Sequence, residues 1–234
     1  MARVFREGPA NAAKSGGIAR ARRPAASLLL LAGGRGSRMG GGNKLYLEFE
    51  GSLLLEKTLN AIAGLFSEVV LIVAKGDGAY VSKRLSHLLA RLGVRVTEDR
   101  KSGIGPLEGL RAGLSVMKEE WGFLLGCDMP SPREDVINRM RRFCGQGTDA
   151  VVAEYGGYIE PLHAFYGRAC ASAAERAIAR GDRKIKLFYD EVRLTIVSEG
   201  LFKNYRGYEN SFLNLNTPRD IERLRGAMDK GAWL

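Results

Sequence analysis

The chain has 234 residues, 45% of them hydrophobic, so it is long enough to bury the core of one well-packed domain. Its formal net charge is +10, and no run of residues approaches the roughly 18 consecutive apolar residues that a membrane-spanning helix needs. Three widely spaced cysteines without a CxxC pair, with only two histidines, argue against a disulfide framework or a zinc site and favour a cytoplasmic location.

The first 26 residues differ from the rest of the chain. They are rich in Ala, Gly, Arg and Pro and show no helical or strand periodicity, so we expect residues 1–26 to be a disordered basic tail. About half of the excess positive charge lies in this tail, and the remainder of the chain shows no nucleic-acid-binding motif. We therefore expect one domain over residues 27–234, with no membrane contact and no preference for nucleic acid.

Short apolar runs alternate with longer amphipathic segments in the first half of that domain. The apolar runs predict strands at residues 27–32, 69–74, 94–98 and 121–127, and the amphipathic segments predict helices at 53–66, 79–93 and 106–120. The second half is less regular. It predicts strands at 149–154, 159–166 and 193–197, a helix at 168–180, a segment at 184–190, and a closing helix after Pro218 with Thr217 as its N-cap.

This order of elements predicts the fold class. Strands that alternate with crossover helices form a mostly parallel, Rossmann-like sheet with helices on both faces, a three-layer αβα sandwich. In such sheets, ligands bind beyond the carboxyl ends of the strands. Functional residues are therefore expected directly after each predicted strand.

A glycine-rich segment directly follows the first predicted strand. The sequence LLLLAGGRGSRMGGGNK offers many flexible backbone amides together with Arg35, Arg38 and Lys44, a composition suited to a bound phosphate. A Walker A loop is excluded because the chain has no Gly–Lys pair, and the dinucleotide fingerprint fails because Met39 stands at its third glycine. We therefore expect a third kind of phosphate-binding loop.

The segment LAGGRGSRMG, followed by Lys44, resembles the signature of the nucleotidyltransferase superfamily that activates sugars, polyols and molybdopterin. Four further segments resemble the molybdenum cofactor guanylyltransferases: EDRKSGIGPLEGL, CDMP, EPLHAFY and FLNLNTPRD. They occur in the order of that family and span almost the whole predicted domain. The resemblance implies the fold of the nucleotide-diphospho-sugar transferases and the transfer of GMP from GTP to molybdopterin, or to its molybdenum-loaded form, with release of pyrophosphate.

The resemblance also implies roles for individual residues. Arg38 and Lys44 would be catalytic, stabilising charge on the α-phosphate and on the departing pyrophosphate. Asp128 would bind Mg²⁺, because a hard cation prefers oxygen ligands. The nucleotide-binding residues would be Leu31, Ala32, Gly33, Gly34, Arg35, Gly36, Ser37, Arg38, Lys44, Asp99, Gly105, Pro106, Leu107 and Asp128. On the acceptor side, the candidates are Asn214, Asn216 and Arg183, and transient contact with molybdoenzymes or with other cofactor-biosynthesis proteins is expected.

Other functions stay open at this point. Asn43 stands where the best-known family members have Asp, so guanine is indicated only by the loop at 104–110 and by the overall resemblance. A molybdopterin cytidylyltransferase, or a nucleotidyltransferase for a sugar or polyol phosphate, would use the same chemistry. A non-catalytic nucleotide- or nucleic-acid-binding protein is the alternative from a different class.

Overall fold

The fold is an eight-stranded sheet between two layers of helices, seen in a computed structural model that describes residues 3–5, 24–32, 44–49, 51–100, 103–145, 147–215, 220 and 222. The order of the strands is β1-β10-β8-β9-β7-β2-β5-β6. Neighbouring strands run parallel except where β9 pairs with β7 and with β8. The strands are β1 Arg3–Phe5, β2 Ala26–Leu31, β5 Glu68–Val73, β6 Val94–Glu98, β7 Trp121–Gly126, β8 Ala150–Tyr155, β9 Tyr158–Gly167 and β10 Leu194–Val197.

The helices occupy the connections between strands, and a small hairpin lies apart from the main sheet. The α-helices are α1 Leu54–Ile62, α2 Gly78–Arg84, α3 Ser86–Arg91, α4 Pro106–Val116, α5 Glu134–Arg141 and α6 Cys170–Ala179. The 3-10 helices are η1 Lys44–Tyr46, η2 Ala63–Leu65, η3 Ile185–Glu191, η4 Glu199–Leu201 and η5 Tyr208–Phe212. The hairpin pairs β3 Glu48–Phe49 with β4 Ser52–Leu53.

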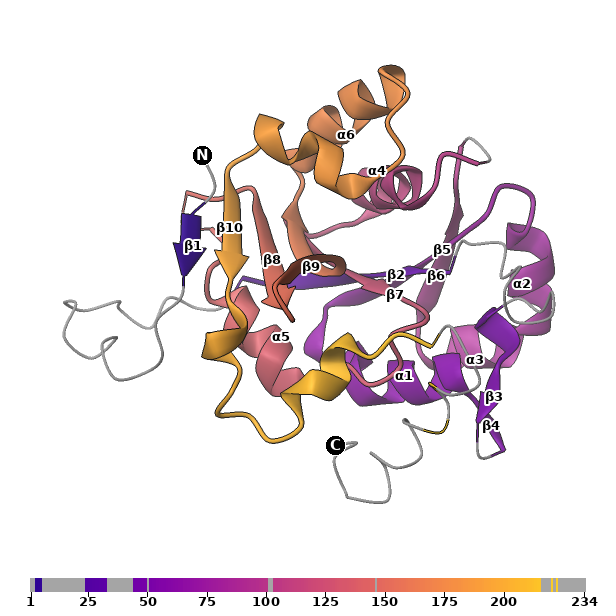
Figure 1. The fold of residues 1–234 in the computed structure, drawn as a ribbon. Helices are drawn as coiled ribbons and strands as arrows, with labels where there is room; N and C mark the ends of the chain where they lie inside the picture. The colour runs from indigo at the N-terminus through magenta and orange to yellow at the C-terminus, as the bar shows by residue number, and fades with distance from the viewer. Residues whose placement is uncertain are drawn as a thin grey trace.

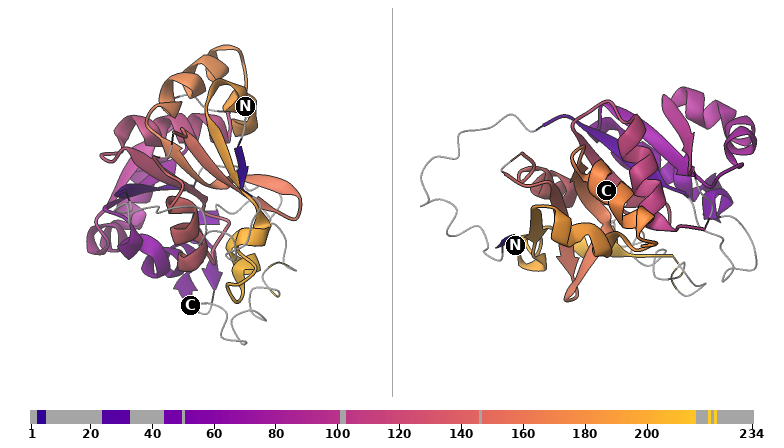
Figure 2. Two further views of the ribbon diagram at one scale, coloured as in Figure 1. Left: turned by 90° about the vertical axis from the view of Figure 1, so that its left-hand side faces the viewer. Right: turned by 90° about the horizontal axis from the view of Figure 1, so that it is seen from above.

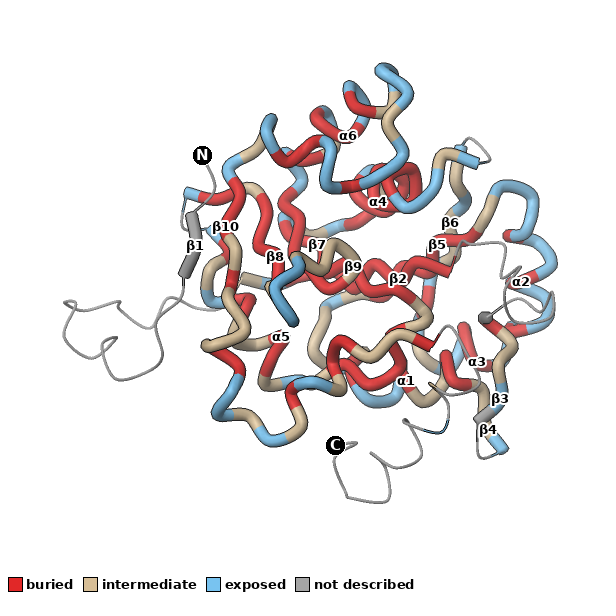
Figure 3. Tube along the Cα trace, in the orientation of Figure 1, coloured by how far each residue is buried: buried red, intermediate tan, exposed pale blue. Residues whose placement is uncertain are grey.

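Two hydrophobic cores lie on opposite faces of the sheet. Successive residues of β2 alternate between them: Leu28 and Leu30 pack with α1, α3 and α5, whereas Leu29 and Leu31 pack with α4 and α6. Figures 1 and 2 show these two helical layers, and Figure 3 shows the buried central strands between them. The three-layer, mostly parallel αβα fold predicted from the sequence is therefore confirmed.

Some elements differ from the prediction. The single helix expected at 79–93 is divided at Leu85 into α2 and α3, and α4 ends at Val116, four residues earlier than expected. The strand expected at 159–166 is present as β9, but it runs against its neighbours because a tight turn at Gly156 and Gly157, both with positive φ, joins it to β8. The closing helix after Pro218 lies largely outside the described residues, as does its N-cap Thr217.

The edge of the sheet includes a strand that the sequence analysis does not predict. Arg3–Phe5 form β1, which pairs in parallel with β10, so these three residues depart from the structureless tail expected over 1–26. The physical reason is that β10 is otherwise an edge strand with unpaired backbone groups, which accept an extended segment with little regard to its sequence. Residues 6–23 lie outside the described residues.

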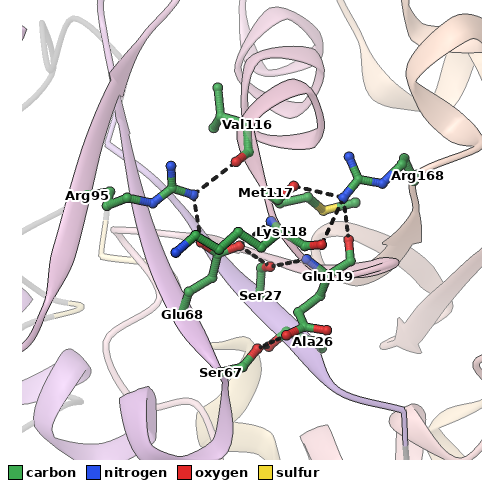
Figure 4. A network of polar contacts seen from close by, with 10 residues as sticks. All are labelled: Ala26, Ser27, Ser67, Glu68, Arg95, Val116, Met117, Lys118, Glu119 and Arg168. Carbon is green, nitrogen blue, oxygen red and sulfur yellow. Dashed lines mark hydrogen bonds and ion pairs between the residues drawn. The ribbon is translucent and has the colours of Figure 1, made fainter.

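Polar contacts join the strands at their amino ends. The Glu68 carboxylate accepts hydrogen bonds from the Ser27 hydroxyl (2.6 Å), the Lys118 backbone N–H and the Arg95 guanidinium (2.6 Å). Beside it, Nη2 of Arg168 donates to three consecutive carbonyls, those of Met117, Lys118 and Glu119, where the chain leaves α4 for β7 (Figure 4). These contacts fix the α4–β7 connection and leave the carboxyl edge of the sheet for other groups.

Among the described residues, no helix has both the length and the apolar character needed to cross a lipid bilayer.

Candidate active site

The carboxyl ends of β6, β5, β2 and β7 form one continuous edge. In the register of the sheet, Leu31 is paired with Ile72 on one side and with Gly126 on the other, and Ile72 is paired in turn with Thr97. Three spacings between neighbouring strands separate β6 from β7, roughly 14 Å. The segments predicted to carry functional residues after these strands therefore all begin at the same edge of the sheet.

Asp128 follows β7 and lies directly beside the end of β2. The Cys127 N–H donates to the Leu31 carbonyl (3.0 Å), and the Met129 N–H turns back to the Gly126 carbonyl (3.0 Å). An ideal Cβ on Gly126 would lie 2.6 Å from Oδ1 of Asp128, so the absence of a side chain at Gly126 makes room for this carboxylate. Asp128 is thus placed next to the start of the glycine-rich segment.

Asp99 occupies the other end of the same edge, directly after β6. Its N–H donates to the Val73 carbonyl (3.0 Å), which fixes its backbone, and its side chain is partly buried. Burial, with the negative charge of Glu108, raises the pKa of Asp99 from 3.8 to about 6, although Arg111 opposes the shift. Oδ1 of Asp99 is buried and has no hydrogen-bond partner among the described residues.

The loop before α4 stands beside Asp99. Gly105 adopts φ 83° and ψ −162°, a conformation that residues with a side chain rarely adopt, and it is followed by Pro106 in the first turn of α4. Leu107 is fully buried in the core above β2. Glycines let α4 approach the strand closely, because a Cβ on Gly109 would collide with Cδ1 of Leu31 and would lie 3.7 Å from Oδ1 of Asp99.

The acceptor-side candidates lie at two places. Asn214 is next to Leu215, whose N–H donates to the Asp128 carbonyl (2.8 Å), so the FLNLN segment reaches the carboxyl end of β7. Arg183 instead lies beside the loop before α4, since its carbonyl oxygen is 3.4 Å from the position of an ideal Cβ on Gly105. Asn216 lies outside the described residues.

The glycine-rich segment itself is also outside the described residues, which resume at Lys44. The candidates Gly33, Gly34, Arg35, Gly36, Ser37 and Arg38 belong to it, and of Lys44 only the backbone is described, as the first residue of η1. Leu31 and Ala32 are described and buried, and the Ala32 N–H donates to the Ile72 carbonyl (2.8 Å). The start of the loop is therefore anchored between β5 and β7.

Residues 28–194 match the family model of the MobA-like NTP transferase domain. The chain belongs to the MobA-like NTP transferase family. It is a nucleotidyltransferase of the kind that the loop signature indicates, and the match spans the strands that carry Asp99 and Asp128.

Individual relatives agree with this family. The chain is 28% identical over 198 residues to the molybdenum cofactor guanylyltransferase of Photobacterium profundum, covering 85% of this chain and 94% of the relative. It is 31% identical over 197 residues to a probable molybdenum cofactor guanylyltransferase of Pelotomaculum thermopropionicum, covering 84% and 90%. The crystal structure of molybdopterin-guanine dinucleotide biosynthesis protein A from Archaeoglobus fulgidus superposes with a TM-score of 0.73 at 26% identity, covering 87% of this chain and 99% of that one.

A buried ion pair next to Asp99 in this MobA-like transferase is not among the site residues predicted from the sequence. Glu108 and Arg111 are 1% and 4% exposed, and both nitrogens Nε and Nη2 of Arg111 donate to the Glu108 carboxylate at 2.8 Å. The available signal was a Glu and an Arg three residues apart in a stretch, residues 107–114, that is otherwise free of polar side chains, a spacing that places both on one face. The sequence could not show that this face is turned toward the protein interior.

Proposed function

We propose that this MobA-like transferase transfers GMP from GTP to the terminal phosphate of molybdopterin or of its molybdenum-loaded form. In this reaction an oxygen of the acceptor phosphate forms a bond to the α-phosphorus of GTP, the bond from that phosphorus to the β-phosphate bridge breaks, and pyrophosphate leaves. No protein nucleophile is needed, so the protein contributes positioning and charge. The family match over residues 28–194, with relatives named as guanylyltransferases, carries the proposal.

The span of the site suits a nucleoside triphosphate. The distance between β6 and β7, roughly 14 Å at three strand spacings, is comparable to the length of an extended nucleotide, with the glycine-rich segment leaving β2 between them. We assign the base to the Asp99 end, with Gly105, Pro106 and Leu107, and the phosphates to the segment from Leu31 to Arg38 with Lys44. Arg38 and Lys44 would offset the charge that builds on the α-phosphate and on pyrophosphate.

We assign guanine as the base because of the chemistry of Asp99. An ionised carboxylate only accepts hydrogen bonds, and the Watson–Crick edge of guanine presents adjacent N–H donors at N1 and at the 2-amino group. Cytosine presents only its amino group beside an unprotonated ring nitrogen, which a carboxylate would repel. Asp99, with a partly buried carboxyl beside the loop at Gly105, is therefore suited to a guanine edge.

Asp128 suits a magnesium ion that arrives with the triphosphate. Its carboxylate is a hard oxygen ligand in the space left by Gly126, and the described residues contain no cluster of three His, Cys, Asp or Glu side chains that could hold a metal alone. Phosphate oxygens and waters would complete the coordination. When bound, Mg²⁺ would neutralise charge on the phosphates.

The acceptor is proposed to bind beyond Asp128. Asn214 lies beside the Leu215–Asp128 hydrogen bond, and Asn216 is two residues further along the chain. Their amides can donate to a phosphate and accept from a pterin ring. Arg183 is also proposed to contact the acceptor, from the side of the Gly105 loop.

The test is turnover of the purified full-length protein with Mg²⁺, molybdopterin and each nucleoside triphosphate, with the products identified by mass spectrometry. We expect the guanine dinucleotide and pyrophosphate from GTP, and thermal stabilisation by GTP exceeding that by CTP. Asp128→Asn should abolish turnover while the far-UV circular dichroism spectrum is retained, and Asp135→Asn, on α5, is the matched control. A cytosine dinucleotide product, or full turnover by Asp128→Asn, would refute the assignment.

A further inference from the structure

We propose that the buried Glu108–Arg111 ion pair is a positioning element of the nucleotide site, which orients Asp99 and sets its charge for the base. The inference rests on the proposed function only in assigning Asp99 to the nucleotide. Glu108 and Arg111 would contact no substrate themselves and would act on the nucleotide through Asp99.

The first observation is that Glu108 holds the turn that carries Asp99. Oε2 of Glu108 accepts a hydrogen bond from Nε of Arg111, and Oε1 accepts one from Nη2 of Arg111 and another from the backbone N–H of Arg100, each at 2.8 Å. The Asp99 N–H is held from the other side by the Val73 carbonyl. The peptide units on both sides of the Asp99 side chain are therefore anchored, one by β5 and the other by α4.

The second observation is the depth of the pair. Charged side chains are almost never fully buried unless they are paired, and a buried ion pair gains little stability over apolar side chains of the same size. Glu108 and Arg111 nevertheless stand in the first turns of α4, each directly after a fully buried leucine, Leu107 or Leu110. Two charges therefore stand in the interior at positions where the neighbouring side chains of α4 are apolar.

The third observation is that two buried polar atoms at the ion pair make no hydrogen bond to the described residues. Oδ1 of Asp99 and Nη1 of Arg111 each lack a hydrogen-bond partner within the described ranges. Among the described residues, the charges that act on Asp99 are Glu108, which disfavours its ionised form, and Arg111, which favours it; Glu175 of α6 acts in turn on Arg111. Glu98 and Arg100, its neighbours in the chain, are exposed.

This arrangement makes Asp99 responsive to its neighbours. Because burial and Glu108 bring the pKa of Asp99 to about 6, its carboxylate is charged at neutral pH and becomes protonated only slightly below it. Protonation would convert an acceptor for two N–H donors into a group that matches the guanine edge poorly. Nucleotide affinity should therefore fall with decreasing pH, by roughly tenfold for each pH unit below the midpoint, as for one linked proton.

The experiment measures the dissociation constant of GTP with Mg²⁺ between pH 5 and pH 8 by calorimetry, on the full-length protein. Asp99→Asn has no carboxyl to titrate at this position. The pH dependence of GTP binding that remains in this variant is therefore the part due to protonation of the triphosphate itself. Glu108→Gln removes the negative charge that, together with burial, raises the pKa of Asp99. The midpoint of the pH dependence of GTP binding should therefore move to lower pH in this variant. The double variant Glu108→Gln with Arg111→Gln removes the opposing charge as well, so its midpoint should lie between those of Glu108→Gln and the wild-type protein.

The double variant also guards against misfolding, because it leaves a neutral pair that can form hydrogen bonds rather than an unpaired buried charge. Glu191 forms ion pairs with Arg176 and Arg180 at the surface. Glu191→Gln is therefore the matched control and should keep the wild-type midpoint. Equal midpoints in all folded variants, or an equal loss of affinity at every pH, would overturn the inference. Wild-type protein that fails to bind GTP at any pH would instead overturn the proposed function.

Discussion

At the level of single residues, the two acids selected from the sequence lie at opposite ends of one edge in different surroundings. Asp128 occupies the space beside Gly126, next to the start of the glycine-rich segment, whereas Asp99 lies against α4 and Glu108. Since roughly 14 Å separates their strands, the two carboxylates cannot share one metal ion. The sequence indicated both residues, but the difference in their surroundings comes from the helix that packs over only one of them.

His163 is a buried histidine that makes the stability of the protein depend on pH. It lies between Phe123 and Phe212, with ring centroids 5.0 and 4.8 Å away, and neither of its ring nitrogens has a hydrogen-bond partner in the described part of the chain. Burial lowers its pKa from 6.5 to about 3. Between these values the unfolded chain binds a proton that the folded protein does not, so the free energy of unfolding falls as the pH drops below 6.5.

We predict that replacing His163 removes this dependence. Protonation of His163 in the unfolded chain should lower the free energy of unfolding by roughly 1.4 kcal/mol as the pH falls from 7.5 to 5.5, as for one linked proton. His163→Leu should lose this component of the pH dependence in urea unfolding experiments. His87→Leu, at an exposed histidine, should keep it. An unchanged pH dependence in His163→Leu would contradict the assignment of a neutral imidazole.

At the level of elements, the glycines of α4 explain how the helix comes close enough to position the site. A Cβ on Gly113 would lie 2.8 Å from Cδ1 of Ile72, and one on Gly109 would collide with Leu31, so both positions are restricted by the sheet beneath. The helix was predictable from its apolar period. Its close approach was not, because a glycine within a helix has no sequence signal that separates a packing contact from a weak point.

Arg168 should stabilise the connection that leads from this helix into β7. Arg168→Gln removes a guanidinium that donates to the carbonyls of Met117, Lys118 and Glu119. We expect the free energy of unfolding to fall by about 1 kcal/mol, the usual net value for a lost hydrogen-bonding group. The kcat should be unchanged, because Arg168 lies at the opposite edge from the site. Urea unfolding with Arg206→Gln as an exposed control measures the effect, and equal stabilities of the two variants would contradict it.

At the level of the whole molecule, the domain is proposed to fold without its tail. Among the described residues, both cores begin at or after Ala26, and β1 pairs with β10 alone, through three residues. A chain of residues 24–234 should therefore keep its fold and its turnover, with a melting temperature lowered by only a few degrees. Calorimetry and the turnover assay test this. Aggregation of the shortened chain, or loss of GTP binding, would show that the tail belongs to the working molecule.

The sequence alone was sufficient for the layers of the fold and for the family that the loop signature indicates. The apolar period and the order of the elements can be read along the chain without knowledge of distant contacts. In any parallel sheet, a segment that directly follows a buried strand lies at the carboxyl edge, where ligands bind. The strands carrying Asp99 and Asp128 were predicted to within one residue at each end, so both acids were expected at the carboxyl edge.

Only the tertiary structure decided which residues surround these acids. The reversal of β9, the pairing of Arg3–Phe5 with β10, and the inward direction of Glu108 and Arg111 depend on contacts between segments far apart in the chain. The charge state of Asp99 depends on them as well, because burial and neighbouring charges act through space and not along the sequence. The sequence thus indicated Asp99, and the packing of α4 against the sheet determined its surroundings.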